Sequence, residues 1–260
     1  MSTRLVALAV VGAALIAAVA VHGAPKKDEP FKRGALGRRA YRLYVPLKGS
    51  IEPRTLVVAL HGCWQTPEDF ARGTRLNDAA ERRGLLVLYP AQSRWDNVNR
   101  CWNWFDPANQ SRQAGETAEL AALVQAVARE QGTAPGRAIT IGFSAGGFMA
   151  VNLLCAAPEL VSAVAVVAGG PYRCGLGLDG ALETMFSRLV GAESRVTETR
   201  DRAMRVLHHD GRGDPLIEAW FVPGLGHAWS GGDPRATHTW PPGPNATDLI
   251  LDFLLEPRVK

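Results

Sequence analysis

Ser144 is the residue of this chain whose surroundings most clearly indicate chemistry. It lies in the pentapeptide Gly142-Phe143-Ser144-Ala145-Gly146. A Gly-x-Ser-x-Gly spacing alone is weak evidence, because a chain rich in glycine and serine can contain it by chance. Here an apolar, strand-forming segment, residues 138–141, precedes it, and residues 145–150 begin a helical segment. That strand, turn and helix would hold Ser144 on a sharp turn at a sheet edge, where it can act as a nucleophile.

Serine chemistry also requires hydrogen-bond donors for the negative oxygen that forms when a carbonyl group is attacked. The backbone N–H of Ala145 lies at the start of the predicted helix, where the helix dipole favours negative charge. A second donor is expected in the loop after an earlier strand. The segment His61-Gly62-Cys63-Trp64-Gln65 follows the apolar residues 56–60, so we predict the N–H of Cys63 as that donor.

A histidine that accepts the serine proton follows the serine in the chain in this arrangement. His227 comes after a predicted strand, residues 217–222, and a flexible Pro223-Gly224-Leu225-Gly226 loop that could bring its ring over Ser144. We therefore predict His227 as the general base, with three later histidines as alternatives: His208, His209 and His238. The first two are neighbours in a predicted strand, so at most one of them faces inward.

The carboxylate that would orient the histidine is not identified by the sequence. Asp210 and Asp214 lie in a short turn between two predicted strands, which must then be antiparallel. That turn is at the far end of the strand from His227, about 20 Å away, so neither aspartate fits the role. Position along the chain leaves four other candidates, and nothing selects among them: Asp179, Glu183, Glu193 and Asp233.

The elements that must position these residues alternate between short apolar runs and longer helical segments. Such alternation is typical of parallel βαβ units. We predict buried strands at residues 55–60, 85–89, 138–143 and 163–168, crossover helices at 68–83, 116–130 and 145–156, and a last helix at 247–254. The sequence therefore predicts the α/β-hydrolase fold, a mostly parallel central sheet flanked by helices, with its chemistry at the carboxyl ends of the strands.

The N-terminus has the pattern of an export signal. Arg4 precedes an apolar run at residues 5–21 that contains Ala18-Val19-Ala20, small residues that suit cleavage. We predict a signal peptide at residues 1–20, a flexible leader at 21–35 and one domain at 36–260, with an uncleaved membrane anchor as the alternative to cleavage. The expected location is secreted or periplasmic, without stable membrane association after cleavage. A net charge of +4 without a block of like charges argues against a nucleic-acid partner.

Four cysteines and four tryptophans carry further expectations. None of the cysteines, Cys63, Cys101, Cys155 and Cys174, lies in a Cys-x-x-Cys spacing, so we expect neither a metal nor a cofactor. A helix from Ser144 would place Cys155 about 16 Å from the catalytic edge, where Cys174 should lie, so we predict a free, buried thiol at Cys155. The tryptophans flank the catalytic segments and form either an aromatic substrate cleft or core packing: Trp64, Trp102, Trp104 and Trp229.

Together these segments resemble the poly(3-hydroxybutyrate) depolymerase-like esterases, which include feruloyl and acetylxylan esterases. The resemblance runs over residues 36–254, and its carriers are the segment at residues 61–65, Tyr89-Pro90-Ala91-Gln92, Cys101-Trp102-Asn103-Trp104-Phe105, the Ser144 turn and Gly224-Leu225-Gly226-His227-Ala228-Trp229. It implies metal-free hydrolysis of an ester or polyester through an acyl-enzyme on Ser144. It also implies a disulfide between Cys63 and Cys101.

One departure from this family bears on activity. Similar proteins carry a strand with a His-Gly-x-x-Asp-type segment between the positions of Gly170 and His227, and this chain has none. The interval is shortened, so the strand and the acid are both expected to be missing. The leading hypothesis is a secreted carboxylic ester hydrolase. The alternatives are a catalytically impaired domain that binds acyl or polymer ligands, and an acyltransferase; the particular ester and the oligomeric state stay open.

Overall fold

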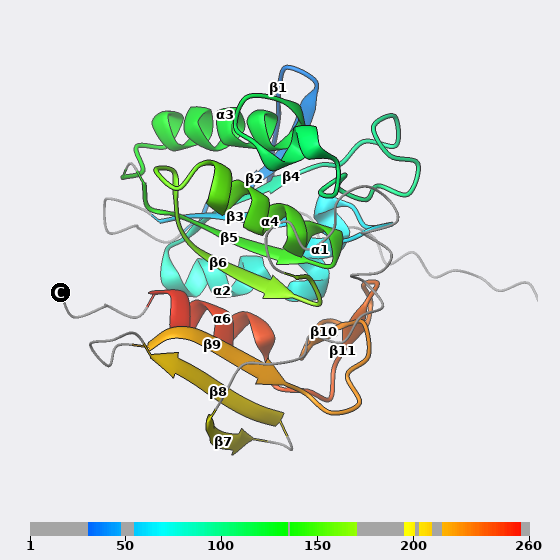
Figure 1. Cartoon of the computed structure of the whole chain (residues 1–260), viewed down its shortest axis with the longest axis vertical. Helices are drawn as coiled ribbons and strands as arrows, with labels where there is room; N and C mark the ends of the chain where they lie inside the picture. The colour runs from blue at the N-terminus through cyan, green and yellow to red at the C-terminus, as the bar shows by residue number, and fades with distance from the viewer. Residues whose placement is uncertain are drawn as a thin grey trace, which may run out of the picture.

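The computed structural model describes residues 31–47, 55–134, 136–170, 195–200, 203–209 and 215–255. Its centre is a six-stranded sheet in the order β1-β2-β4-β3-β5-β6 (Figure 1). The last four strands in this order are parallel, and β1 and β2 join antiparallel at one edge. The bounds are β1 Phe31–Leu36, β2 Arg39–Tyr44, β3 Leu56–Leu60, β4 Leu86–Pro90, β5 Ala138–Phe143 and β6 Val161–Val167.

Three central strands are continuous apolar runs because helices cover both of their faces. Every residue of β3, β4 and β5 is buried. A parallel sheet covered on both sides has no solvent face, so its strands lose the alternation of polar and apolar residues. The strands predicted from these apolar runs agree with the structure to within two residues at each end, and the predicted fold class is confirmed.

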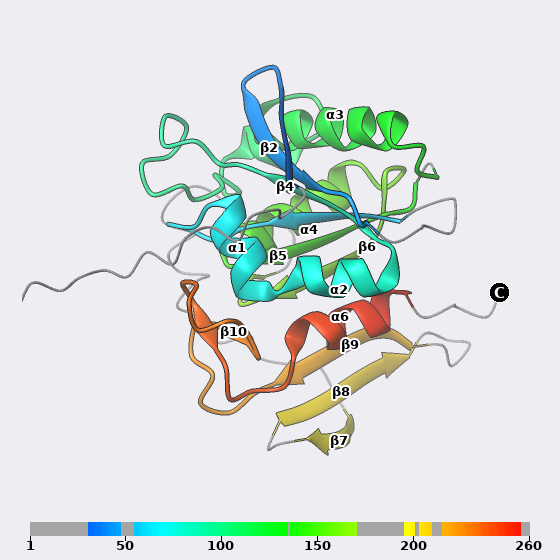
Figure 2. The same ribbon diagram turned by 180° about the vertical axis from the view of Figure 1, so that it is seen from behind.

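Helices pack on both faces of the sheet. On one face lie α3 (Gly115–Glu130) and α4 (Ala145–Ala156), and on the other lie α1 (Pro67–Thr74), α2 (Leu76–Arg83) and α6 (Ala246–Leu255) (Figures 1 and 2). Each face has its own buried apolar cluster. Among the described residues, no helix has the length and apolar character needed to cross a bilayer.

The segment predicted as one helix at residues 68–83 is two helices. Arg75 has a left-handed backbone, with φ 53°, and separates α1 from α2. The hydroxyl of Thr74 accepts a hydrogen bond from the N–H of Leu76 at 3.3 Å, which satisfies a donor at the start of α2. The amphipathic pattern continues across this break, and so the periodicity alone could not reveal it.

The predicted flexible leader is wrong for residues 31–35. They belong to β1, which pairs with β2 from Phe31 opposite Tyr44 to Leu36 opposite Arg39. Aromatic contacts hold the hairpin down: the ring of Phe31 packs edge-on against Tyr44 and Tyr89. Residues 1–30, with the predicted signal peptide, lie outside the described residues.

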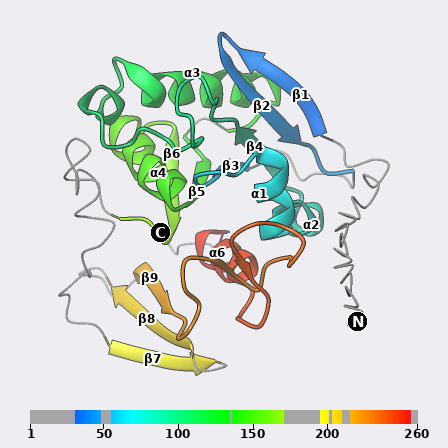
Figure 3. The same cartoon turned by 90° about the vertical axis from the view of Figure 1, so that its right-hand side faces the viewer.

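A separate antiparallel sheet precedes the histidine loop. It has the order β7-β8-β9, with β7 Arg195–Arg200, β8 Ala203–His209 and β9 Pro215–Phe221, and lies apart from the central sheet, on the far side of α6 (Figure 3). The antiparallel pairing of β8 and β9 agrees with the argument against Asp210 and Asp214, although Asp210 and Asp214 themselves lie outside the described residues. No described strand pairs with the outer edge of β6, as expected if a strand is missing.

Cys155 is a free cysteine, as predicted, but it is exposed rather than buried. The buried residues of α4 end at Leu153, one turn before the helix ends at Ala156. Cys155 lies beyond them in the last turn, which accounts for its exposure. Cys174 lies outside the described residues.

Candidate active site

Ser144 lies on a strained turn between β5 and α4. Its backbone has φ 53° and ψ −123°, a conformation that costs a non-glycine residue energy and clusters at functional sites. Its N–H donates to the carbonyl of Val167 in β6 at 2.9 Å. A Cβ on Gly142 would collide with the backbone of Gly146, and one on Gly146 would collide with the carbonyls at the end of β3. The glycines therefore permit the close packing that holds Ser144 at the edge of the sheet.

His227 is the histidine that reaches Ser144. Its Nε2 lies 2.9 Å from the Oγ of Ser144, so the hydroxyl donates to Nε2 when the ring carries its proton on Nδ1. The His227 loop leaves β9 through Gly224 and Gly226, both with positive φ, and the ring packs on Phe143 with 5.0 Å between centroids. This pair has the geometry of a nucleophile and its base.

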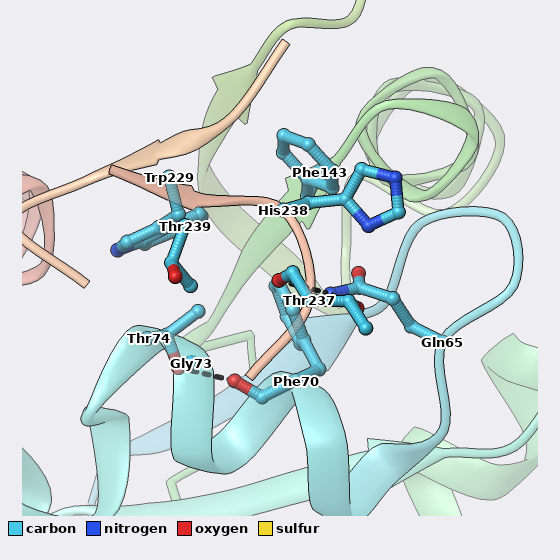
Figure 4. Close-up of a pocket in the computed structure, with 9 residues that line it drawn as sticks. All are labelled: Gln65, Phe70, Gly73, Thr74, Phe143, Trp229, Thr237, His238 and Thr239. Carbon is cyan, nitrogen blue, oxygen red and sulfur yellow. Dashed lines mark hydrogen bonds between the residues drawn. The ribbon is translucent and has the colours of Figure 1, made fainter. Parts of the chain in front are cut away.

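A second histidine, His238, lies near the first. The rings of His227 and His238 are edge to face, 6.3 Å apart, and His238 also packs beside Phe143 (Figure 4). The pKa of His227 is lowered, first by burial and then by repulsion from His238. A neighbouring carboxylate would raise this pKa, and among the described residues none hydrogen-bonds to His227.

Asp233 is the only one of the four acid candidates within the described residues. Its carboxylate binds Arg235, with Oδ2 2.6 Å from Nη2 and Oδ1 3.0 Å from Nε. This pairing with the Arg235 guanidinium lowers the pKa of Asp233 to about 2. The Asp233 carboxylate thus forms an ion pair within its own loop. The other candidates, Asp179, Glu183 and Glu193, lie outside the described residues.

The two predicted oxyanion donors come from the ends of neighbouring strands. Ala145 follows β5 and Cys63 follows β3, and these strands are paired up to Leu60 opposite Gly142. Among the described turns and loops, the Cys63 N–H donates to no backbone carbonyl. Ala145 is the first residue of α4, and the first N–H groups of a helix have no partner within it. Both N–H groups thus fit the prediction that they serve as oxyanion donors.

The loop after β3 is attached to the rest of the protein by a disulfide between Cys63 and Cys101, which is confirmed. The N–H of Trp64 also donates to the carbonyl of Asn99 at 2.7 Å, and the side chain of Gln65 accepts from the N–H of Gly62 at 2.9 Å. The loop that carries the predicted Cys63 donor is therefore fixed on both sides.

A family model described as "Esterase PHB depolymerase" matches residues 39–216. The chain belongs to this esterase family. The resemblance inferred from the sequence is thereby confirmed.

Relatives of this esterase-family chain include both depolymerases and feruloyl esterases. Poly(3-hydroxyalkanoate) depolymerase C of Paucimonas lemoignei is 33% identical over 130 residues, 50% of this chain and 31% of that protein. Feruloyl esterase B of Neurospora crassa is 32% identical over 145 residues, 55% of this chain and 48% of that protein. The chain spans about a third to a half of the length of these curated relatives.

A solved structure shows the same fold. Acetyl xylan esterase from Aspergillus awamori superimposes with a TM-score of 0.53 at 20% identity, over 58% of this chain and 56% of that one. The match supports the central sheet and flanking helices that position Ser144 in this esterase-family chain.

Three of the four tryptophans predicted for a substrate cleft belong to the core, so the cleft interpretation is wrong for them. Trp102 is 0% exposed and donates from Nε1 to the carbonyl of His61. Trp104 stacks on Phe148, and Trp229 is buried against Phe70. Trp64 differs: it is 60% exposed, immediately after Cys63. It is the one tryptophan of this set that can contact a ligand.

The crevice beside the histidines is too narrow to hold a substrate. It lies between α1 and the segment at 237–239, where Gln65, Thr237 and His238 gather at one end (Figure 4). It has no room for a water molecule. His227 and Trp64, in contrast, are exposed.

Several buried polar residues near the site were not predicted. Arg39, Gln92 and Glu116 are each 3% exposed or less, and the N–H of Gln92 donates to the buried His61. Gln92 lies within the Tyr89-Pro90-Ala91-Gln92 segment that supported the family resemblance, so its motif was a signal that could have been followed. For Arg39 and Glu116, far apart in the chain, the sequence offers no comparable signal.

Proposed function

We propose that this chain is a secreted serine hydrolase of carboxylic esters, with Ser144 as nucleophile and His227 as general base. The observation that carries the proposal is the 2.9 Å contact between Ser144 Oγ and His227 Nε2 on a strained strand-to-helix turn. Membership of the esterase family supports the reaction class. Burial lowers the pKa of His227, which keeps the ring neutral and able to accept a proton at mildly acidic pH.

The reaction proceeds in two steps. His227 removes the hydroxyl proton as the Oγ of Ser144 attacks the ester carbonyl, and the N–H groups of Cys63 and Ala145 bind the oxyanion. The tetrahedral intermediate releases the alcohol, which takes the proton from His227, and leaves an acyl group on Ser144. A water molecule then attacks the acyl-enzyme while His227 takes its proton, and His227 passes that proton to the leaving Oγ of Ser144 as the carboxylic acid is released.

The proposed substrates are esters with an apolar acyl group. The relatives are named as depolymerases of hydroxyalkanoate polymers and as feruloyl and acetylxylan esterases. The exposed ring of Trp64, next to the proposed Cys63 donor, supports an apolar or aromatic group near the reacting carbonyl. Secretion is supported by the apolar run at residues 5–21 and by a disulfide of the kind that persists in oxidising compartments.

Labelling with a fluorophosphonate tests this proposal. The purified protein should gain one adduct on Ser144 and should hydrolyse short-chain p-nitrophenyl esters, and Ser144→Ala should do neither. Cys155→Ser, which changes an exposed residue on α4, is the matched control and should behave as wild type. An unlabelled, inactive wild-type protein would contradict the enzyme proposal.

A second candidate is a domain that binds acyl or polymer ligands without turnover. It is favoured by one observation: no carboxylate among the described residues orients His227. Wild-type protein that adsorbs to a hydroxybutyrate polymer film, yet gives neither an adduct nor released product, would support this candidate over the hydrolase.

A further inference from the structure

A cluster of buried polar side chains lies beneath the loop that carries the Cys63 N–H. Its members come from five places in the chain, and all but the last are 3% exposed or less: Arg39 at the start of β2, His61 after β3, Gln92 after β4, Glu116 in the first turn of α3, and Asn103 in the segment after Cys101. Burying polar and charged groups is costly unless each finds partners. In this cluster, a chain of hydrogen bonds runs from Glu116 to the loop that carries Cys63.

Glu116 is the acceptor at the centre of the cluster. Its Oε1 accepts from Nε2 of Gln92 at 2.5 Å and from Nδ2 of Asn103 at 2.8 Å, and its Oε2 accepts from the N–H of Asn103 at 2.8 Å. Burial raises the pKa of Glu116, while these three donors and the charge of Arg39 favour the ionised form. The carboxylate therefore fixes both Gln92 and Asn103.

Gln92 hydrogen-bonds to both segments that the disulfide joins. Its Oε1 accepts from Nη1 of Arg39 at 2.5 Å, and its Nε2 also donates to the carbonyl of Cys101 at 3.0 Å. Its backbone N–H donates to Nε2 of His61 at 3.1 Å. Cys101 is bonded to Cys63, and His61 is two residues before it, so the two attachments of Gln92 flank the proposed donor.

His61 has a single tautomer in this arrangement. Because Nε2 accepts from Gln92, the ring proton lies on Nδ1 and is donated to the carbonyl of Gly62 at 2.8 Å. The carbonyl of His61 accepts from the indole N–H of Trp102 at 3.0 Å, and Arg39 lies over the Trp102 ring. His61, which leads into Cys63, is therefore held both by its ring and by its backbone carbonyl.

We propose that Glu116 is a positioning residue for catalysis: through Gln92, His61 and Cys101 it fixes the Cys63 N–H that binds the oxyanion. This inference rests on the proposed hydrolase function. The disulfide and the bonds made by Gln65 and Asn99 hold the outer part of this loop, and the cluster around Glu116 holds its buried start at His61. Since a buried carboxylate stabilises a fold poorly compared with apolar packing, an orienting role accounts for Glu116 better than stability does.

The test compares Glu116→Gln with Glu130→Gln. The first substitution would present an N–H₂ group to the donors of Gln92 and Asn103, whereas Glu130 is the exposed last residue of α3 and, among the described residues, bonds only to its neighbour Gln131. Rates of p-nitrophenyl ester hydrolysis are normalised to the fraction of Ser144 labelled by fluorophosphonate. Because loss of one oxyanion donor lowers kcat about 100- to 1,000-fold, we expect its displacement in Glu116→Gln to lower kcat about 10-fold with KM within twofold. Glu130→Gln should match wild type.

Asn103→Ala is a milder second variant, because the backbone N–H of residue 103 still reaches Glu116. We expect a two- to fivefold lower kcat. A merely structural role would reduce the labelled fraction and the melting temperature but leave kcat per labelled site unchanged. That result in both variants overturns the proposal.

Hydrogen exchange provides a readout that needs no turnover. The peptide spanning residues 61–65 should exchange about 10-fold faster in Glu116→Gln than in Glu130→Gln. Unchanged exchange overturns the positioning role whether or not the protein is a hydrolase. The opposite outcome is also distinguishable. If Glu116→Gln exchanges faster but the wild-type protein gains no fluorophosphonate adduct, Glu116 still holds the loop and the proposed function is contradicted.

Discussion

Ser144 and His227 form a hydrogen-bonded pair whose ring is held by packing on Phe143. In serine hydrolases with a full triad, removing the acid alone lowers kcat about 10⁴-fold, which is less than the loss caused by removing the serine or the histidine. A protein built as a dyad would thus be a slow but real catalyst. The sequence identified both members because each belongs to a local motif, whereas an orienting carboxylate has no local signature.

Asp233→Asn tests whether the one described acid candidate acts on His227. Its carboxylate is paired with Arg235, so we expect kcat to stay within twofold of wild type while the free energy of unfolding falls by about 1 kcal/mol. Ester hydrolysis and urea denaturation measure the two effects. Arg235→Gln, which breaks the same pair from the other side, is the control. A kcat lower by about 10⁴-fold in Asp233→Asn alone would identify it as the triad acid.

His238 should tune the pH at which His227 works. Because His238 and burial both lower the pKa of His227, the acidic limb of kcat/KM should lie below pH 6.5 in wild type. His238→Gln removes the repulsion and raises this pKa, so kcat/KM at pH 5.5 should fall roughly twofold while the value at pH 8 stays unchanged. His238→Lys places a permanent positive charge beside His227 and should leave the acidic limb at or below its wild-type position. Identical acidic limbs in wild type and His238→Gln would show that the two rings do not interact.

At the level of elements, the sequence predicted the strands and helices that have a clear apolar pattern. It missed the boundaries that depend on single residues. The buried strands and α4 follow from continuous apolar runs and an uninterrupted helical pattern. The break between α1 and α2 depends on the backbone of Arg75 alone. The hairpin of β1 and β2 was missed in part because β1 is half exposed and contains two cations, Lys32 and Arg33, which weaken the apolar signal.

The disulfide joins the loop after β3 to the segment after β4, so its loss should affect both stability and chemistry. Cys101→Ser opens a loop of 38 residues, which in the chain-entropy model lowers the free energy of unfolding by about 4 kcal/mol. We also expect a several-fold lower kcat, since Cys63 loses an anchor. Thermal unfolding and ester hydrolysis measure these changes, with Cys155→Ser as the control for a free, exposed cysteine. A variant as stable and active as wild type would show that hydrogen bonds alone hold the loop.

At the scale of the whole molecule, the site is assembled from two sheets. Ser144 and the two proposed oxyanion donors follow strands of the central sheet, whereas His227 follows β9 of the separate sheet (Figure 3). Sequence motifs could predict each part but not the buried cluster of Arg39, Gln92 and Glu116. Those residues meet only because β2, β4 and α3 pack together, and tertiary contacts of this kind leave no periodic trace in a single sequence.

The same buried cluster should make global stability depend on acid. Burial lowers the pKa of His61 to about 4, below the ordinary value near 6.5 of the unfolded chain. The unfolded state therefore binds a proton between pH 6.5 and 4 that the folded state refuses, so stability present above pH 6.5 is lost as the pH falls towards 4. A single group with this shift contributes about 3 kcal/mol. Urea denaturation at pH 7 and pH 4 measures the loss, to which surface and buried carboxylates also contribute.

His61→Gln isolates the contribution of the ring. The variant should be less stable than wild type at pH 7, because the bond to the N–H of Gln92 is weakened, yet it should lose about 3 kcal/mol less between pH 7 and pH 4. His238→Gln, at an exposed histidine, should keep most of the wild-type loss. Equal losses in wild type and His61→Gln would mean that the folded protein accommodates a charged His61, and the neutral ring would then no longer be required to hold the loop that leads to Cys63.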